Sequence, residues 1–216
     1  MNTALQALVE YDSVTHLSLA GAHVTEHDMR LMQSISSLQV LGLSGEGIRD
    51  SQIPFIVDMP ALRVLAITDA PLSDRGIAEL KRRPSIAGLE LARTRVTGAG
   101  LSAFSQLEGL ILDSTALSDV GLREIASLRH LRRLSLNDVR LSEALLVECV
   151  TKLPNLARLE VNGTAISDVG LEAILHHRSS GWLWIDVHNT NVTTATAQRL
   201  AQQYGVRLVY STEWAK

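Results

Sequence analysis

A pattern of aliphatic residues that recurs every 21 to 26 positions constrains the fold of this chain more than any other feature. The triplet Leu38-x-x-Leu41-x-Leu43 is followed 24 positions later by a triplet of the same spacing, which begins at Leu62. A period of about 20 to 50 residues is the signature of repeat proteins, so we predict a solenoid of stacked, similar units. Eight copies align in this way, beginning at Val14, Leu38, Leu62, Ile86, Leu107, Leu131, Leu156 and Trp182.

Each copy predicts one short strand followed by one short helix. Alternating aliphatic residues such as Leu41 and Leu43 are typical of a strand with one buried face. A hydroxyl residue followed by an acid then predicts a helix N-cap and a negative charge at the positive end of the helix dipole. These pairs are Thr25-Glu26, Ser73-Asp74, Ser118-Asp119, Ser142-Glu143 and Ser167-Asp168, and a Gly-Leu or Gly-Ile pair begins a short helix at 76–77, 100–101, 121–122 and 170–171.

Stacking explains how such small units can be stable. One strand and one helix cannot bury their apolar faces alone, whereas neighbouring copies can bury them against each other. We therefore predict an α/β solenoid with a concave parallel sheet of about eight or nine strands and short helices on the convex side. The composition agrees, because 35 of 216 residues are leucine while aromatic residues make up only 4% of the chain.

These copies resemble leucine-rich repeats over nearly the whole chain. The copy that runs from Leu156 to Leu171 is similar to the cysteine-containing subtype found in F-box proteins. At the position of the usual cysteine or asparagine the copies carry threonine, as in many bacterial repeats: Thr94, Thr115, Thr164 and Thr190. The resemblance implies a right-handed horseshoe and a protein-binding role. We expect no F-box, because the first copy begins at about residue 13.

We expect one domain over residues 1–216, because no linker, charge run or low-complexity segment divides the chain. Residues 1–12 are predicted to form a helical N-terminal cap, and residues 13–197 about eight repeats. Residues 198–216 are predicted to form a C-terminal cap, with a final helix, an edge strand over 206–210 and a covering segment that contains Trp214. Such caps shield the otherwise open ends of a solenoid.

The exposed strand positions predict a binding surface on the C-terminal half of the sheet. Side chains alternate between the core and the concave surface, and neighbouring strands lie about 4.8 Å apart. Arg133, Arg158 and Trp184 should therefore form one row, with Glu160 and Asp186 in a parallel row. Arginine and tryptophan are enriched among interface hot spots, so we predict a protein or peptide partner with an acidic or phosphorylated group and an apolar anchor. Alternatively, Arg158 stacks on Trp184 and pairs with Glu160 or Asp186. These residues then only make the sheet surface polar and bind no partner.

A third row, at the edge of the same surface, has two interpretations. Asp113, Asn137, Asn162 and His188 could bind an extended peptide through their polar side chains. Such residues also bond nearby backbone groups where strands end, which is a purely structural role. We favour the structural role, and we keep Asn162 and His188 among the candidate partner-binding residues with Arg133, Arg158, Glu160, Trp184 and Asp186.

Other chemistry is not expected. Cys149 falls within a predicted helix with no base beside it, which indicates a buried packing residue and not a catalytic thiol. The side chains of His16, His23 and His27 should diverge, so they should not form a metal site. We therefore expect no enzyme, metal or cofactor. A net charge of −3 gives no general attraction for nucleic acid, and we expect Lys81-Arg82-Arg83 and the pair Arg93 and Arg95 to be solvated surface charges. No apolar run approaches the roughly 18 residues of a membrane span.

The sequence leaves the biological setting open between three descriptions. We expect a cytoplasmic interaction scaffold, monomeric or weakly oligomeric, because a single cysteine fits a reducing compartment and no secretory signal is visible. An effector that acts in a host cell without a visible signal is one alternative. A structural subunit of a larger assembly, which would use its convex helices or open ends, is the other.

Overall fold

Nine parallel strands form one sheet in the part of the chain that the computed structural model describes, residues 2–9, 13–21, 24–177 and 184–210. The strands follow each other across the sheet in sequence order, each beside the next. They are β1 (His16–Ala20), β2 (Val40–Ser44), β3 (Val64–Thr68), β4 (Gly88–Glu90), β5 (Gly109–Ile111), β6 (Arg133–Ser135), β7 (Arg158–Glu160), β8 (Trp184–Asp186) and β9 (Arg207–Val209).

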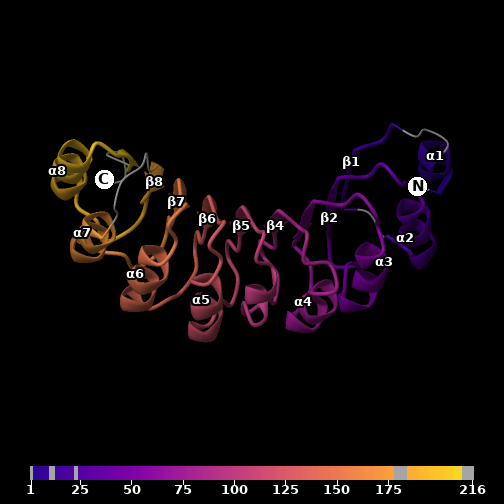
Figure 1. Ribbon diagram of the computed structural model, residues 1–216, viewed down its shortest axis with the longest axis horizontal. Helices are drawn as coiled ribbons and strands as arrows, with labels where there is room; N and C mark the ends of the chain where they lie inside the picture. The colour runs from indigo at the N-terminus through magenta and orange to yellow at the C-terminus, as the bar shows by residue number, and fades with distance from the viewer. Residues whose placement is uncertain (1, 10–12, 22–23, 178–183, 211–216) are drawn as a thin grey trace.

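Helices connect successive strands and lie along the outer side of an open arc, while the sheet lines its inner side (Figure 1). The helices are α1 (Asn2–Val9), α2 (Glu26–Gln33), α3 (Ile53–Val57), α4 (Asp74–Leu80), α5 (Asp119–Ile125), α6 (Glu143–Thr151), α7 (Asp168–His176) and α8 (Thr194–Tyr204), with short 3-10 helices η1 (Asp50–Gln52) and η2 (Leu101–Ala103). The predicted α/β solenoid, with a concave parallel sheet and convex helices, is confirmed.

The core is a continuous stack of aliphatic side chains between sheet and helices. The second residue of each strand pairs in register with that of the next, so Leu41 lies beside Leu65, and Leu134 beside Leu159. From β2 to β8 these second residues are almost completely buried. The aliphatic excess of the sequence therefore fills one core that runs the length of the arc, as the repeat predicts.

The chain turns away from the sheet at the same position of every copy. The residue there has a positive φ in all eight copies: Gly21, Gly45, Asp69, Arg93, Ser114, Asp138, Gly163 and Asn189. In four of the five later copies the next residue is threonine, the exception being Val139, and the Thr94 hydroxyl donates to the Leu91 carbonyl at 2.7 Å. The same bond recurs at Thr115, Thr164 and Thr190. This hydroxyl satisfies a carbonyl where the strand pattern ends, which explains why a polar residue is tolerated in the buried turn.

The predicted helix caps are partly confirmed. The side chains of Thr25, Ser73 and Ser118 accept hydrogen bonds from the first turn of their helices. Ser142 and Ser167 also stand at the N-cap, as predicted, but their side chains make no such bond. The Ser167 hydroxyl instead donates to Glu143 of the preceding copy at 2.7 Å. The copy with the shortest step also differs, since the pair 100–101 leads only into η2.

Some predictions concern residues outside the described ranges. These are the core position of Trp182, the covering role of residues 211–216 with Trp214, and the divergence of His23 from its neighbours. Among the described helices, none is both long enough and apolar enough to cross a membrane.

Candidate functional site

Strands β6 to β9 place four large side chains in one row on the concave side. Arg133 pairs in register with Arg158, Arg158 with Trp184, and Trp184 with Arg207. The first three were expected to be neighbours from the repeat alone. Arg207 was missed, although it holds the first outward position of the closing strand and the same alignment could have found it. We call Arg133, Arg158, Trp184 and Arg207 the concave row.

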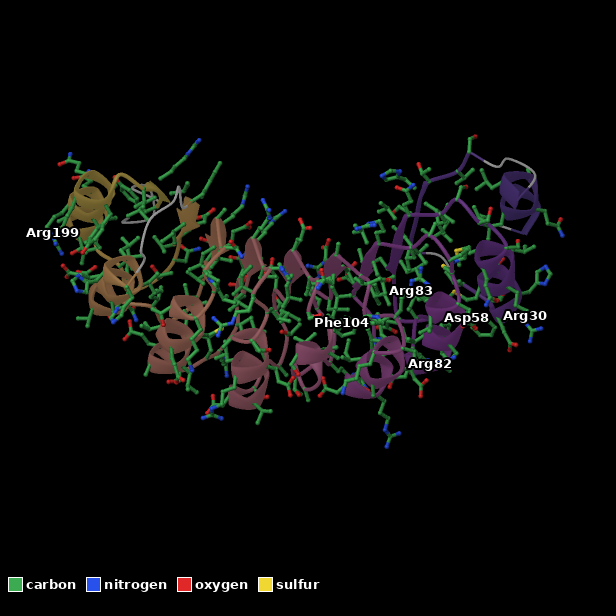
Figure 2. All side chains as sticks on the ribbon, viewed as in Figure 1. Arg30, Asp58, Arg82, Arg83, Phe104 and Arg199 are labelled. Atoms are coloured by element: carbon green, nitrogen blue, oxygen red, sulfur yellow. The ribbon has the colours of Figure 1, made fainter. Side chains whose placement is uncertain are left out.

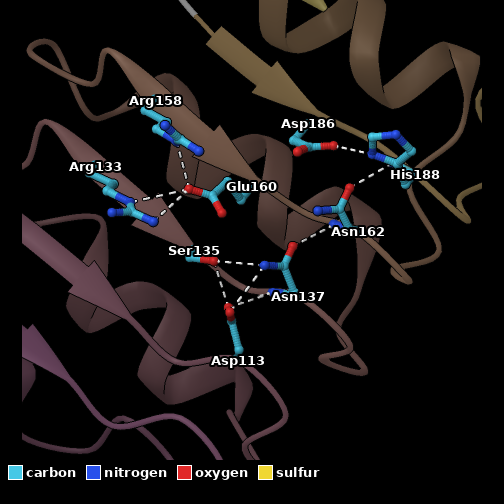
Figure 3. Close-up of polar contacts among 9 residues, drawn as sticks. All are labelled: Asp113, Arg133, Ser135, Asn137, Arg158, Glu160, Asn162, Asp186 and His188. Atoms are coloured by element: carbon cyan, nitrogen blue, oxygen red, sulfur yellow. Dashed lines mark hydrogen bonds and ion pairs between the residues drawn. The ribbon is translucent and has the colours of Figure 1, made fainter. Parts of the chain in front are cut away.

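Glu160 lies between the first two arginines of the concave row (Figure 3). One of its carboxylate oxygens accepts from Arg158 Nε at 2.7 Å and lies 3.0 Å from Arg133 Nη2. The Glu160 side chain is only 12% exposed, against 46% for Arg133 and 38% for Arg158. One carboxylate therefore holds two arginines whose outer parts face solvent, and the predicted pairing of Arg158 with Glu160 is present.

Trp184 stands between two guanidinium groups. The Arg158 guanidinium carbon lies 4.6 Å from the centre of the Trp184 ring, and that of Arg207 lies 4.1 Å from it. Both distances are within the range of cation–π attraction. The strand order puts Arg158 and Arg207 on opposite sides of Trp184. The predicted stacking of Arg158 on Trp184 is present, but Trp184 is not the openly exposed anchor that the repeat predicts.

The parallel acidic row is arranged differently from the sequence interpretation. Glu160 and Asp186 are register neighbours, as expected. Asp186 bonds Nδ1 of His188, which lies two residues beyond the end of β8, and no ion pair joins Asp186 to Arg158 among the described residues (Figure 3). Of the two acids proposed as partners of Arg158, only Glu160 forms an ion pair with it in the described structure.

The polar residues at the strand ends form a ladder that joins four copies (Figure 3). The Asp113 carboxylate accepts from the Asn137 backbone N–H at 2.9 Å, and the Asn137 side-chain oxygen accepts from the Asn162 N–H at 2.9 Å. The Asn162 side-chain oxygen accepts in turn from the His188 N–H at 2.6 Å. These are the bonds of the structural interpretation, in which each side chain satisfies the backbone of the next copy.

Two concave positions expected to be exposed are buried. Ser135 is 1% exposed, because its hydroxyl donates to Asp113 at 2.6 Å and also accepts from the Asn137 amide. Ala92, two residues beyond the end of β4, is 3% exposed. The outward direction of a strand side chain does not keep it in contact with water when larger neighbours close over it.

In the basic cluster after α4, Lys81 and Arg82 are exposed, as predicted, whereas Arg83 is half-buried and is not a solvated charge. The Arg83 guanidinium donates to the backbone carbonyls of Val57 and Pro60 in the preceding copy and of Leu62 at the start of its own copy, at 2.5 to 3.3 Å. Burial lowers the pKa of Arg83. Figure 2 places Arg83 on the inner side of α4, whereas Arg82 lies on its outer side near Asp58. Arg83 therefore supplies hydrogen-bond donors to backbone carbonyls where the helix of the preceding copy ends.

Arg93 is also paired rather than free. Its guanidinium makes two bonds to the Asp69 carboxylate, at 2.5 and 2.8 Å. These bonds lower the pKa of Asp69 to about 2. Both residues occupy the turn position of positive φ in adjacent copies, so the pair joins two turns.

Cys149 has the character of a packing residue. It is 2% exposed in α6, and burial raises the pKa of its thiol to about 12. The thiolate, which is the nucleophile in cysteine chemistry, is therefore negligible at neutral pH. Within the described ranges, no three His, Cys, Asp or Glu side chains are grouped so that they could hold a metal ion.

A sheet of one parallel strand per copy, bent into an arc with helices outside, is the leucine-rich repeat fold. The chain is similar in structure to an internalin (inlF) from Listeria monocytogenes, with a TM-score of 0.67 and 16% identity over 98% of this chain. It spans little more than half of that protein, 57% of its length. It is also similar to internalin C2 (inlC2) of the same organism, with a TM-score of 0.66 and 20% identity, over 95% of this chain and 84% of that one.

Comparison with protein-family profiles and with curated sequences finds no match. The likeness to internalins therefore shows the leucine-rich repeat fold. The narrower assignment, to the cysteine-containing or the bacterial threonine subtype, stays a prediction from the sequence.

Proposed function

We propose that this protein is a non-catalytic interaction module that binds a protein or peptide partner through the C-terminal half of its concave surface. The partner-binding residues are Arg133, Arg158, Glu160, Trp184 and Asp186, with Asn162 and His188 at the edge. We also propose that residues 1–216 form a single domain, that the protein acts as a scaffold, and that its partner carries acidic or phosphorylated groups.

The concave row is the observation that carries this proposal. Three arginines and one tryptophan lie on four adjacent strands, and only one glutamate neutralises the first two arginines. Arginine and tryptophan on a rigid element are typical hot-spot residues. Because the backbone of each strand is fixed by its neighbours, the row loses little conformational entropy when a partner binds.

The proposal is tested by capture from a lysate of the source organism. We compare the wild-type chain with Arg133→Gln/Arg158→Gln, which removes two charges and keeps the length of the side chains. The matched control is Arg75→Gln/Arg123→Gln, which removes two charges from the exposed side of α4 and α5. Loss of two hot spots should reduce the captured partner on the order of tenfold or more.

The outcomes of the capture experiment separate the alternatives. Equal capture by the wild type, the concave variant and the control would show that the concave row is not the interface. Loss of capture in the control alone would favour a subunit that assembles through its convex helices. Phosphatase treatment of the lysate separates a phosphorylated partner, whose capture falls, from one that is acidic through its carboxylates.

A further inference from the structure

We infer that Arg158, Trp184 and Arg207 form a clamp for an extended acidic segment of the partner, with carboxylates on alternate residues. We call these three residues the arginine–tryptophan clamp. The inference rests on the proposed function and adds to it a binding residue, Arg207, a positioning role for Trp184, and the chemistry of the occupant.

Trp184 positions the two guanidinium groups of the clamp. Both lie over its ring, at 4.6 and 4.1 Å from the ring centre. A guanidinium that stacks on an aromatic face keeps the N–H donors at its edge available for a carboxylate. Stacking also restricts the arginine side chain before binding, which lowers the entropy cost of forming the complex. Trp184 thus acts through the arginines, and an apolar group of the partner need not reach its faces.

The charges of the surface favour an acidic occupant. Arg133 and Arg158 share the single carboxylate of Glu160, and Asp186 is bound to His188. Arg207 is exposed, and within the described residues no acidic side chain pairs with it. Three arginines against the two carboxylates of Glu160 and Asp186 leave an excess of positive charge. An exposed guanidinium without a carboxylate can bind one from a partner with two parallel hydrogen bonds.

The spacing of the arginines favours an extended segment. From Arg133 on β6 to Arg207 on β9 there are three strand intervals, or about 14 Å. Five residues of extended chain, with acids at the first, third and fifth positions, span about 13 Å and present all three carboxylates on one face. A segment of this kind that crosses the strands matches the row of cations. A block of consecutive acids would turn half of its carboxylates away.

The inference is tested with two fluorescent peptides of identical composition. One alternates glutamate and serine, and the other carries the same glutamates as a block followed by the serines. Their affinities are measured by fluorescence anisotropy for the full chain and for Arg207→Gln. Arg199→Gln is the matched control, since it removes the same charge from α8, on the outer side. We expect the alternating peptide to bind more tightly, and Arg207→Gln to weaken it about tenfold, as for loss of a charge-assisted hydrogen-bonded pair.

Two variants of Trp184 test its positioning role. Trp184→Phe keeps an aromatic face for the arginines and should bind the alternating peptide nearly as the wild type does. Trp184→Leu removes the face and should weaken binding by a factor similar to Arg207→Gln. Thermal unfolding of both variants is measured alongside, and comparable midpoints show that the difference in affinity is not a difference in folding.

The results distinguish this inference from the proposed function. If Arg207→Gln binds the alternating peptide like the wild type while Arg133→Gln/Arg158→Gln loses both peptide and partner, the concave interface stands and the clamp is wrong. Equal affinity for the two peptides, or no binding of either, also overturns the clamp, and the lysate capture then decides the proposed function separately. Tighter binding of a single-stranded oligonucleotide than of the alternating peptide would overturn the acidic protein segment as occupant.

Discussion

Three glycines hold the same position near the start of their helices, and each is close to the preceding copy. A Cβ at Gly121 in α5 would lie 2.2 Å from the backbone oxygen of Thr97. At Gly76 in α4 and Gly170 in α7 it would meet the acid of the copy before, at 2.9 and 2.2 Å. The sequence associates these glycines with helix starts, and the structure adds that the copies can stack this closely only without a side chain there.

We predict that Gly121→Ala destabilises the protein by about 1–3 kcal/mol, because the added methyl group meets backbone that cannot rotate away. Gly109→Ala is the control. Its Cβ would find no atom within 4 Å on the concave side, so it should change stability by less than about 1 kcal/mol. Urea unfolding of the two variants measures the difference. Equal effects would mean that the copies can shift apart at little cost.

Asp28 replaces glycine at this position in the first copy. Its carboxylate accepts from the Thr25 backbone N–H at 2.9 Å and from the Thr25 hydroxyl at 2.6 Å. In a later copy Ser73 makes the same two bonds to Asp50 of the preceding copy, at 2.8 and 2.6 Å. Asp28 therefore supplies from within its own helix the carboxylate that a neighbour supplies elsewhere, in a capping box.

This bond makes the first copy sensitive to acid. The hydrogen bond from the Thr25 side chain lowers the pKa of Asp28 below its ordinary value of 3.8. A carboxyl whose pKa is lower in the folded state stabilises that state above its unfolded pKa, and the contribution is lost as the pH falls through the folded pKa. We predict that Asp28→Asn costs stability at pH 7 and that this cost shrinks below about pH 4. Urea unfolding at both pH values, with Asp119→Asn as control, measures it, and a cost independent of pH would contradict the assignment.

At the scale of the elements, carboxylates join the start of one helix to the start of the next. Asp74 at the first position of α4 accepts from the Thr97 backbone N–H at 2.9 Å and from its hydroxyl at 2.5 Å. The same two bonds run from Ser73 to Asp50, from Ser167 to Glu143 and from Thr193 to Asp168. The sequence interpretation assigned these acids to the helix dipole only. Their bonds to the following copy hold adjacent repeats in register.

The chain contains its own control for this ladder. Asp119 has the same place in α5 as Asp74 in α4, but it is exposed and makes no such bond within the described residues. Asp74→Ala and Asp119→Ala should lose the same small interaction with the helix dipole. We predict that Asp74→Ala lowers the free energy of unfolding by about 1–3 kcal/mol more than Asp119→Ala does, because it also leaves the Thr97 N–H without its acceptor. Chemical denaturation of both variants gives the difference, and equal costs would show that the ladder does not stabilise the stack.

At the scale of the molecule, each copy depends on its neighbours for burial. Phe104 lies near the middle of the arc (Figure 2) and is completely buried in the copy that has only η2 as its helix. This ring fills space that longer helices fill elsewhere. Phe104 is therefore the largest of the buried side chains by which the shortest copy connects the N-terminal and C-terminal halves of the core.

We predict that Phe104→Ala costs about 3–5 kcal/mol and separates the unfolding of the two halves, since a repeat array is coupled only through neighbouring copies. All three tryptophans, at positions 182, 184 and 214, belong to the C-terminal part. Tryptophan fluorescence should then diverge from far-ultraviolet circular dichroism during unfolding of the variant. Phe55→Ala, near the N-terminal end and only partly buried, should leave the two curves coincident. Coincident curves for Phe104→Ala would show that the arc still unfolds as one unit.

The concave row shows which parts of the site could be predicted. Strand alternation and the repeat frame are enough to place Arg133, Arg158 and Trp184 on adjacent strands, because both depend only on backbone periodicity. The burial of Ser135, the pairing of Asp186 with His188 and the contact of Arg207 with Trp184 could not be obtained in this way. The first and the third depend on side chains of adjacent copies, about two dozen residues apart. The second depends on the path of the chain just after β8, since Asp186 and His188 are two residues apart.

The sequence by itself determined that the chain repeats, which residues face the core, and that strands and helices form separate layers, because these follow from a hydrophobic period that the backbone must satisfy. Only the tertiary structure decided how the polar residues are used. Asp74, Glu143 and Arg83 bond the adjacent copy, and Trp184 stands between two arginines. A polar side chain of this kind can interact with a helix dipole, with water or with the backbone of a neighbouring copy. Which of these it contacts depends on distances that exist only once the copies are stacked.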